Sequence, residues 1–463
     1  MNKNSYLINN YIFMKIKNKF LITTNHGSFT LLNKNEFENL TTKNIKKKKL
    51  FEKLEKTGII ITKNNKIKIK EKLLKRNTHL SQGTSLHIVV VTLRCNLKCI
   101  YCHASSKPKE KKEFDMDKNT AKKVVDFIFQ SKTDFLTIEF QGGEPLLNFN
   151  IIKEINEYAK KLNKIHKKNL QKTIVTNLSV MTGEILKYCI KNNITICTSL
   201  DGPKFLHDKN RISKESNYDE IIKWIKKINN SNYKHQIGAL LTTSRETLKY
   251  HKEIIDEYVK LGFESIHLRF LNKLGYAEKN KTKIEYSCEE FIKFWKKSLD
   301  YIIELNLKNT FITERTTLII LQKILSDFDP NYLEMRNPCG AVIGQLAYNY
   351  NGEIFSCDEG RMLNEDLFKL GNVKNDNYEK IINSEKSCSI ISSSINDTTT
   401  CIYCPFKPYC GICPVCNYVE QNTTYAIIPK TTFCKIYKEQ FKYIFEKYLF
   451  DKKFKKIFEN WLK

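Results

Sequence analysis

The stretch from Thr92 to His103 constrains the fold most, because it places Cys95, Cys99 and Cys102 in a Cys-x3-Cys-x2-Cys pattern. It follows residues 86–93, a β-branched run typical of a buried strand. The thiols therefore lie on a loop at the carboxyl end of a strand, where α/β sheets place their chemistry. Three thiolates can hold three irons of a cubane cluster and leave the fourth iron open. A three-ligand zinc knuckle and plain buried cysteines stay open as alternatives.

The region from residue 86 to about 290 alternates apolar strands with helical patterns. Strands are expected at 86–93, 136–140, 173–177, 194–200, 236–242 and 265–271, and helices at 117–130, 151–167, 182–191, 218–229, 247–261 and 288–304. Six βα units in a row indicate α/β architecture with a parallel barrel or part of one.

The remaining chain divides into four further parts. Residues 1–80 predict short strands at 11–14, 20–23 and 28–32, helices at 36–40 (capped by Asn35) and 46–56, and a two-stranded wing at 58–62 and 66–69. This order indicates a small winged-helix-like domain, and a packing domain without a ligand is the alternative. Residues 306–338 predict connecting helices, 339–435 are rich in cysteine, and 436–463 predict one packing helix.

Polar groups and glycines follow the strand ends of the barrel region. Gly142 and Gly143 would let the backbone approach a ligand closely, and Glu144, before Pro145, could receive an ammonium group. The next two strands end in further candidates for ligand contacts, which are Thr176, Asn177, Ser199, Asp201 and Arg211. A capped βα loop with a structural aspartate is the alternative for Asp201.

Eight of the nine cysteines in the last third of the chain form a spaced pattern. Cys339 precedes Gly352-x4-Cys357, and then come Cys401-x2-Cys404-x5-Cys410-x2-Cys413-x2-Cys416 and Cys434. Paired Cys-x2-Cys units suit iron–sulfur clusters and zinc ribbons alike.

Composition limits the classes of function. The 463 residues include 78 Lys and Arg against 50 Asp and Glu, for a formal charge of +28. Lysine is abundant along the whole chain rather than in one patch, so no nucleic-acid partner is expected. No apolar run approaches the ~18 residues of a membrane span, and residues 1–5 lack a secretion-signal pattern. Fifteen cysteines without these signals predict a reducing cytoplasm with the thiols held by metal.

The cysteine spacing, with Tyr101 before the last cysteine, resembles the signature of the radical SAM superfamily. This resemblance implies a partial (β/α)6 TIM-like barrel, one [4Fe-4S] cluster on Cys95, Cys99 and Cys102, and S-adenosylmethionine on its open iron. It also implies that Gly142 to Pro145 bind the methionyl amino group, Arg211 the carboxylate, and Ser199 or Asp201 the ribose.

The later cysteines resemble the SPASM extension of radical SAM peptide maturases, which holds two auxiliary [4Fe-4S] clusters. The resemblance implies that Cys401, Cys404, Cys410 and Cys434 ligate the second auxiliary cluster. Cys339, Cys357 and one of Cys413 or Cys416 would ligate the first. The interval after Cys410 is two residues instead of three, and Cys416 is extra. The number of cysteine ligands of the first auxiliary cluster, three or four, therefore stays open. Asp358 matches a proton-accepting aspartate of sulfatase-maturing relatives, and a hydrogen-bond acceptor in the ligand loop is the alternative.

Three stretches narrow the resemblance to the radical SAM maturases of His-Xaa-Ser peptide systems: 140–149, 338–350 and 409–418. The amino-terminal part is similar to peptide-recognition domains that bind a leader peptide as an extra strand. Together they imply a ribosomally made precursor peptide with a leader, a flavodoxin- or ferredoxin-type electron donor and a second maturase as partners. The expected reaction is hydrogen abstraction that closes a carbon–carbon or thioether cross-link. Formylglycine formation and a non-catalytic iron–sulfur or zinc protein are the alternatives.

Overall fold

A nine-stranded sheet is the centre of the computed structural model, which describes residues 6–213, 217–231, 233 and 236–463. Its strands are, in spatial order, β16 (Leu268–Arg269), β14 (Ile237–Thr242), β12 (Ile194–Ser199), β11 (Asn169–Thr176), β10 (Phe135–Gly142), β6 (Leu86–Thr92), β18 (Gln345–Tyr348), β19 (Glu353–Phe355) and β20 (Lys369–Asn372). Every pair from β16 to β18 is parallel, and the last two pairs are antiparallel. This is a partial TIM-like barrel, as the sequence predicts.

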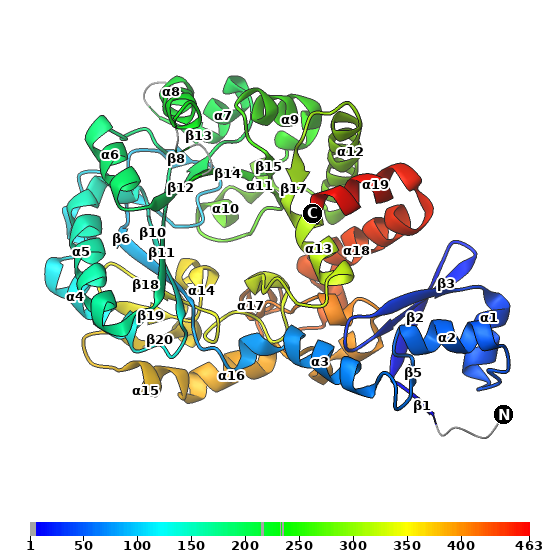
Figure 1. Cartoon of the computed structure of the whole chain (residues 1–463). Helices are drawn as coiled ribbons and strands as arrows, with labels where there is room; N and C mark the ends of the chain where they lie inside the picture. The colour runs from blue at the N-terminus through cyan, green and yellow to red at the C-terminus, as the bar shows by residue number, and fades with distance from the viewer. Residues whose placement is uncertain (1–5, 214–216, 232, 234–235) are drawn as a thin grey trace.

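Helices cover the outer face of the barrel (Figure 1). They are α4 (Lys118–Phe129), α5 (Phe149–His166), α6 (Gly183–Lys191), α8 (Tyr218–Asn229), α9 (His251–Lys260) and α12 (Cys288–Leu307). Each overlaps a predicted helix. The predicted strand at 265–271 is split into β15 (Ser265–Ile266) and β16, and β15 pairs with β17 (Thr313–Glu314) instead of continuing the large sheet.

Strand β18 joins the cysteine-rich region directly to the barrel. It pairs in parallel with β6, with Gln345 opposite Leu86 and Tyr348 opposite Val89. β19 and β20 extend the same sheet, and Cys357 comes two residues after β19 ends. The sequence does not predict this addition. It places β19, which leads to Cys357, one strand away from β6, the first strand of the barrel.

The amino-terminal part has the three predicted strands and both predicted helices, and it differs from the predicted winged helix in its wing. It contains a sheet of β2 (Tyr11–Ile16), β3 (Lys19–Thr24) and β4 (Phe29–Leu32), the pair β1 (Leu7–Ile8) and β5 (Ile60–Ile61), and helices α1 (Lys34–Thr41) and α2 (Lys48–Lys56). The predicted wing strand at 66–69 is wrong, because these residues begin α3 (Lys66–Arg76). Four alternating residues do not distinguish a strand from the start of an 11-residue helix. Asn33, not Asn35, caps α1 through a capping box with Glu36.

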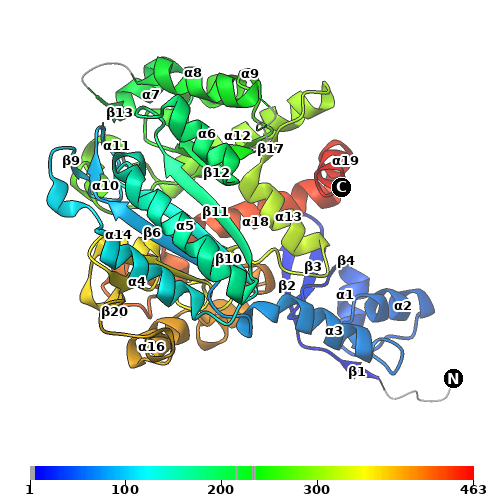
Figure 2. The ribbon, with the colours of Figure 1, turned by 60° about the vertical axis from the view of Figure 1, so that its left-hand side comes forward.

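The carboxyl-terminal segment forms two helices, α18 (Thr432–Phe450) and α19 (Lys452–Trp461), instead of one. Figure 2 shows α18 close to α13 (Arg315–Leu325) and to the amino-terminal sheet. Phe445 packs edge-to-face on Phe29, with ring centroids 5.2 Å apart, and Phe441 stacks on Phe406 at 5.4 Å. α18 therefore contacts both the amino-terminal and the cysteine-rich parts.

Two further predictions concern membrane-spanning segments and the start of the chain. In the part of the chain that the structure describes, no helix is long and apolar enough to cross a membrane. Residues 1–5, which the prediction about a secretion signal concerns, lie outside the described residues. The division of the chain into five parts at 80, 305, 338 and 435 stays a prediction.

Candidate active site and metal centres

The loop after β6 brings its cysteines to fixed hydrogen-bond donors. Cys95 ends β7 (Arg94–Cys95), and its Sγ accepts from the Leu97 amide at 3.4 Å and from Asn177 Nδ2 at 3.9 Å. Cys99 ends β8 (Lys98–Cys99), which pairs with β13 (Arg211–Ile212). Arg211 lies directly opposite Cys99 and its Nη1 reaches Cys99 Sγ at 3.9 Å. Such donors favour thiolates over thiols.

Arg94 fixes the start of this loop. Its guanidinium binds Asp115 through two hydrogen bonds of 2.7 Å, and its Nη1 donates to the Lys109 carbonyl at 2.7 Å. A bidentate arginine–carboxylate pair is among the strongest side-chain contacts. Asp115 and Lys109 belong to the segment that follows the cysteine loop. Because Arg94 ties the start of the loop to this segment, the neighbouring Cys95 has a defined position before any ligand binds.

Gly142 and Gly143 allow β10 to approach the cysteine loop. A Cβ on Gly142 would lie 2.3 Å from the Thr92 carbonyl oxygen, and one on Gly143 would lie 2.3 Å from that of Arg94. The absence of side chains here allows a close approach between two segments of the chain's own backbone. That these glycines also let the backbone approach a ligand stays a prediction.

Glu144 is a fully buried carboxyl group at the same edge. It accepts from Thr176 Oγ1 at 2.7 Å, from the Asn177 amide at 2.8 Å and from the Leu146 amide at 3.0 Å. Burial raises its pKa to about 7, although these three donors act to lower it. Pro145, also buried, opens a short 3₁₀ turn after it. A carboxyl group with this pKa can hold an ammonium group once it is ionised.

Asp201, Tyr101 and Arg211 form a second buried group beside Cys99. Arg211 Nη2 donates to Asp201 Oδ1 at 3.1 Å, Tyr101 donates to Asp201 Oδ2, and the Arg211 guanidinium lies 5.4 Å from the centre of the Tyr101 ring. Asp201 and Arg211 therefore bind each other. Among the described atoms, Arg211 Nε has no hydrogen-bond partner. Ser199 is half-buried at the end of β12. Their roles toward the ribose and carboxylate stay predictions.

The cysteines predicted for the first auxiliary cluster surround a cavity of about 390 Å³ in the cysteine-rich region. Cys339, Cys357, Cys413 and Cys416 all line it. Cys413 caps α17 (Pro414–Gln421) and Cys416 lies in the first turn of that helix, three residues later and so on the same side. This arrangement favours four cysteine ligands over three. Glu359 lines the same cavity, and burial raises its pKa to about 7.

The cysteines predicted for the second auxiliary cluster surround a cavity of about 490 Å³. Cys401, Cys404, Cys410 and Cys434 line it together. The first three come from the loop before α17, and Cys434 lies in the first turn of α18. Cys413 lines this cavity as well, so one residue borders both sites.

The cysteines fit clusters better than single ions. Burial raises the pKa of Cys99 and of Cys339 to about 12, so both would stay protonated at neutral pH unless a metal displaces the proton. Within residues 6–213, 217–231, 233 and 236–463, no group of three or more His, Cys, Asp or Glu side chains is placed to hold one metal ion. A cubane binds each thiolate through a different iron, so its ligands surround a cavity instead of a point.

Charged side chains on the inner face of the barrel were missed by the sequence analysis. Glu139 lies on β10 and points to the other face of the sheet from Leu136, Ile138 and Phe140, which face the hydrophobic core. Burial raises the pKa of Glu139. Arg269, on β16, binds Glu334 at 2.9 Å. Asp358, the predicted proton acceptor, binds Arg361 through Oδ1 at 2.8 and 3.0 Å. Alternation along β10 is the signal that could have identified Glu139.

Family models match two parts of the chain. Residues 89–258 match the radical SAM superfamily, and residues 339–417 match the SPASM iron–sulfur cluster-binding domain. The cysteine-type anaerobic sulfatase-maturating enzyme of Clostridium novyi is 26% identical over 79% of this chain and 95% of its own length. The radical SAM cyclopropyl synthase TigE of Paramaledivibacter caminithermalis is 25% identical over 88% of this chain and 82% of its own length.

Solved structures share the fold. The AdoMet-bound structure of anSMEcpe covers 82% of this chain and 100% of its own, with a TM-score of 0.68 and 21% identity. Streptococcus suis SuiB bound to the precursor peptide SuiA covers 91% and 98%, with a TM-score of 0.55 and 17% identity. The cluster loop and the glycine-lined strand end lie within the first matched region, and every cysteine of the two cavities except Cys434 lies within the second. The chain is therefore an enzyme of the radical SAM superfamily that binds S-adenosylmethionine and a [4Fe-4S] cluster and carries a SPASM domain for auxiliary iron–sulfur clusters.

Proposed function

We propose that this enzyme modifies a ribosomally synthesised precursor peptide and closes a carbon–carbon or thioether cross-link. When bound, the cluster and S-adenosylmethionine supply a 5′-deoxyadenosyl radical that abstracts hydrogen from the peptide. Cross-link formation is a net oxidation, so the electron left on the peptide needs an acceptor. The observation that carries the proposal is the pair of cysteine-lined cavities, one with four cysteines and one with five, of which Cys413 is common to both. Two auxiliary clusters in these cavities would bring the number of clusters to three and would provide the electron acceptor.

The chain's own residues have separate proposed tasks. Cys95, Cys99 and Cys102 hold the radical cluster, and Glu144 binds the methionyl ammonium group. Glu139 of β10 and Arg269 of β16, which interact electrostatically, orient the peptide by charge. Asp358 accepts a proton from the substrate near the first auxiliary site, with Arg361 fixing its carboxylate.

The amino-terminal sheet supports a leader-bearing substrate. β2 is at one edge of its three-stranded sheet and pairs, among the described strands, with β3 alone. An edge strand can accept a peptide as a further strand. Its Phe13 is 48% exposed, which offers an apolar contact for such a peptide. SuiB, solved with a precursor peptide, resembles this chain in fold over 91% of this chain's length.

Formylglycine formation on a sulfatase is a second candidate, and the similarity to the Clostridium novyi enzyme supports it equally. Membership of an enzyme superfamily removes the non-catalytic alternative. A flavodoxin- or ferredoxin-type donor, a second maturase and membership of the His-Xaa-Ser systems complete the proposal.

Mass spectrometry distinguishes the two candidates. The reconstituted enzyme would be incubated without oxygen with S-adenosylmethionine, dithionite and either a precursor peptide encoded beside its gene or a sulfatase peptide. Cross-linking removes two hydrogen atoms from the precursor, whereas formylglycine formation replaces a cysteine thiol or serine alcohol by an aldehyde. Aldehyde on the sulfatase peptide and an unchanged precursor would overturn the proposal. Cys99→Ala is the matched inactive control.

A further inference from the structure

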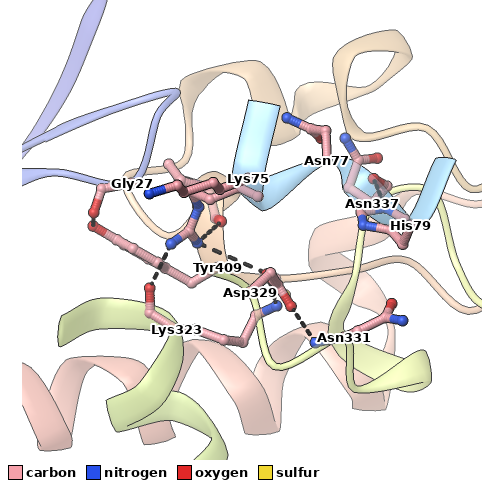
Figure 3. A network of polar contacts seen from close by, with 12 residues as sticks. Gly27, Lys75, Asn77, His79, Lys323, Asp329, Asn331, Asn337 and Tyr409 are labelled. Carbon is pink, nitrogen blue, oxygen red and sulfur yellow. Dashed lines mark hydrogen bonds and ion pairs between the residues drawn. The ribbon is translucent and has the colours of Figure 1, made fainter. Parts of the chain in front are cut away.

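A buried polar network connects the amino-terminal domain to the cysteine-rich domain (Figure 3). Arg76, the last residue of α3, is only 5% exposed. Its Nη1 donates to the Lys323 carbonyl at 2.9 Å, and its Nη2 donates to the Pro408 carbonyl at 3.0 Å. Tyr409 lies against the same guanidinium at 5.7 Å and donates its hydroxyl to the Gly27 carbonyl at 3.2 Å. Arg76 thus binds three separate parts of the chain together.

The network contains more buried positive than negative charge. Lys323, on α13 and 1% exposed, binds Asp329 at 2.5 Å, and Arg76 lies 3.8 Å from the same carboxylate. The Asn331 amide donates to Asp329 at 2.8 Å, and Arg336 donates to the Asn331 side chain at 2.6 Å. Lys323 and Arg76 therefore share the Asp329 carboxylate, and Arg336 is linked to it through Asn331.

Arg336 is the residue of this network with the most unfilled hydrogen-bond donors among the described residues. It is 2% exposed, and within the described residues its Nε and Nη2 have no hydrogen-bond partner. Burial lowers its pKa to about 10. A buried cation without a partner is costly. The structure therefore implies a negative charge nearby that the described side chains do not supply.

Both auxiliary sites border the network. Pro408 and Tyr409 directly precede Cys410, a proposed ligand of the second site, and Arg336 precedes Cys339 of the first by three residues. The Lys323 ammonium interacts electrostatically with the Cys410 thiol, and the Arg336 guanidinium does so with Cys339. Cys410, Arg76, Lys323 and Asp329 also line one cavity of about 780 Å³.

Ligated clusters would supply the missing charge. A cubane held by four thiolates is anionic, and a further electron makes it more so. Nearby positive charge and hydrogen bonds are among the factors that set its reduction potential. Cations that are buried, and therefore weakly screened, act on it most strongly.

We propose that Arg76, Lys323 and Arg336 are positioning residues that raise the reduction potentials of the auxiliary clusters. The amino-terminal domain then contributes, through Arg76, to the electron-accepting part of the enzyme as well as to any peptide binding. This inference requires the auxiliary clusters but no particular peptide, so it can fail or hold independently of the proposed reaction.

A redox titration of the reconstituted full chain, followed by electron paramagnetic resonance, tests the proposal. Arg76→Met should shift at least one auxiliary potential to a more negative value, and Asp329→Asn should shift it to a more positive value. Arg76→Lys, which keeps the charge, should stay close to the wild type. Lys72→Met is the matched control, because Lys72 lies on the same helix and pairs with the exposed Asp327. The radical SAM cluster, within the same sample, should keep its potential.

The two opposite signs separate charge from damage to the fold. Shifts of the same sign in Arg76→Met and Asp329→Asn, or no shift in either, would overturn the proposal. Iron is counted first in every variant. If Arg76→Met loses a cluster, Asp329→Asn decides alone: a positive shift supports the proposal and any other result refutes it.

Discussion

Glu144 is a residue whose charge controls what it can bind. Burial raises its pKa to about 7, so its carboxyl group is half ionised near neutral pH. An ammonium group binds the ionised form, so the affinity for S-adenosylmethionine should rise several-fold between pH 6 and 7.5, below the α-amino pKa of ~7.7. Anaerobic equilibrium dialysis measures this affinity.

The control for this prediction is Glu144→Gln, which should bind more weakly and without the pH dependence. A wild-type affinity that is constant over the same range would contradict it. The same raised pKa has a consequence for stability. The contribution of Glu144 to folding is complete below its ordinary pKa of 4.5 and is lost as the pH rises through about 7.

Cys99 can be tested against a cysteine outside all three sites. Three cubanes require about twelve irons per chain, so Cys99→Ala should reduce the iron content to about eight and abolish 5′-deoxyadenosine formation. Cys388, exposed on α16 (Glu385–Ser393), is the control, and Cys388→Ala should change neither quantity. Iron analysis and chromatography of the nucleoside give both results. Retained 5′-deoxyadenosine in Cys99→Ala would refute the assignment of the radical cluster.

At the scale of elements, the contact between β10 and the cysteine loop depends on the absence of side chains. Gly143→Ala would force a Cβ against the Arg94 carbonyl, and we expect a loss of about 1–3 kcal/mol in the free energy of unfolding. Gly183, the first residue of α6, is the control, because a Cβ there meets no atom within 4 Å. Gly183→Ala should be neutral or stabilising by up to ~1 kcal/mol. Thermal unfolding of both variants decides, and equal stabilities would contradict the steric argument.

Elements with strong local signals could be predicted, whereas those defined by distant contacts could not. The six βα units have apolar strands and amphipathic helices, and all of them are present. β18 has only four residues, all buried, so it lacks alternation. Its place beside β6 depends on pairing across more than 250 residues, which no local pattern encodes. The prediction of a wing strand at 66–69 was wrong for the opposite reason. These four residues alternate locally like a strand, but they belong to the helix α3.

The candidate site divides in the same way. Cysteine spacing is local, so the ligand sets could be proposed from the sequence. Whether Cys413 or Cys416 faces the first cavity depends on α17, whose first turn places both on one side. The charge network of Arg76 joins residues more than 240 positions apart. In the sequence, such cations are indistinguishable from the many lysines and arginines that face solvent.

At the scale of the whole molecule, α18 connects parts that are distant in sequence. Phe445 is fully buried and contacts Phe29 of the amino-terminal sheet as well as Phe406 and Tyr409 of the cysteine-rich loop. Its removal should cost about 3–5 kcal/mol, because the three surrounding rings cannot close the space. We therefore expect Phe445→Ala to expose the amino-terminal domain to protease and to reduce iron at the second auxiliary site.

Tyr448 is the matched control for this prediction, because it lies one turn further along α18, is only half-buried and donates to Glu459 of α19. Tyr448→Ala should cost less and leave both the iron content and the amino-terminal domain unchanged. Limited proteolysis followed by mass spectrometry locates the cleavage, and iron analysis follows the cluster. If both variants release the amino-terminal domain equally, α18 acts through general stability. If only Phe445→Ala does so, the aromatic contact itself holds the domain against the cysteine-rich loop.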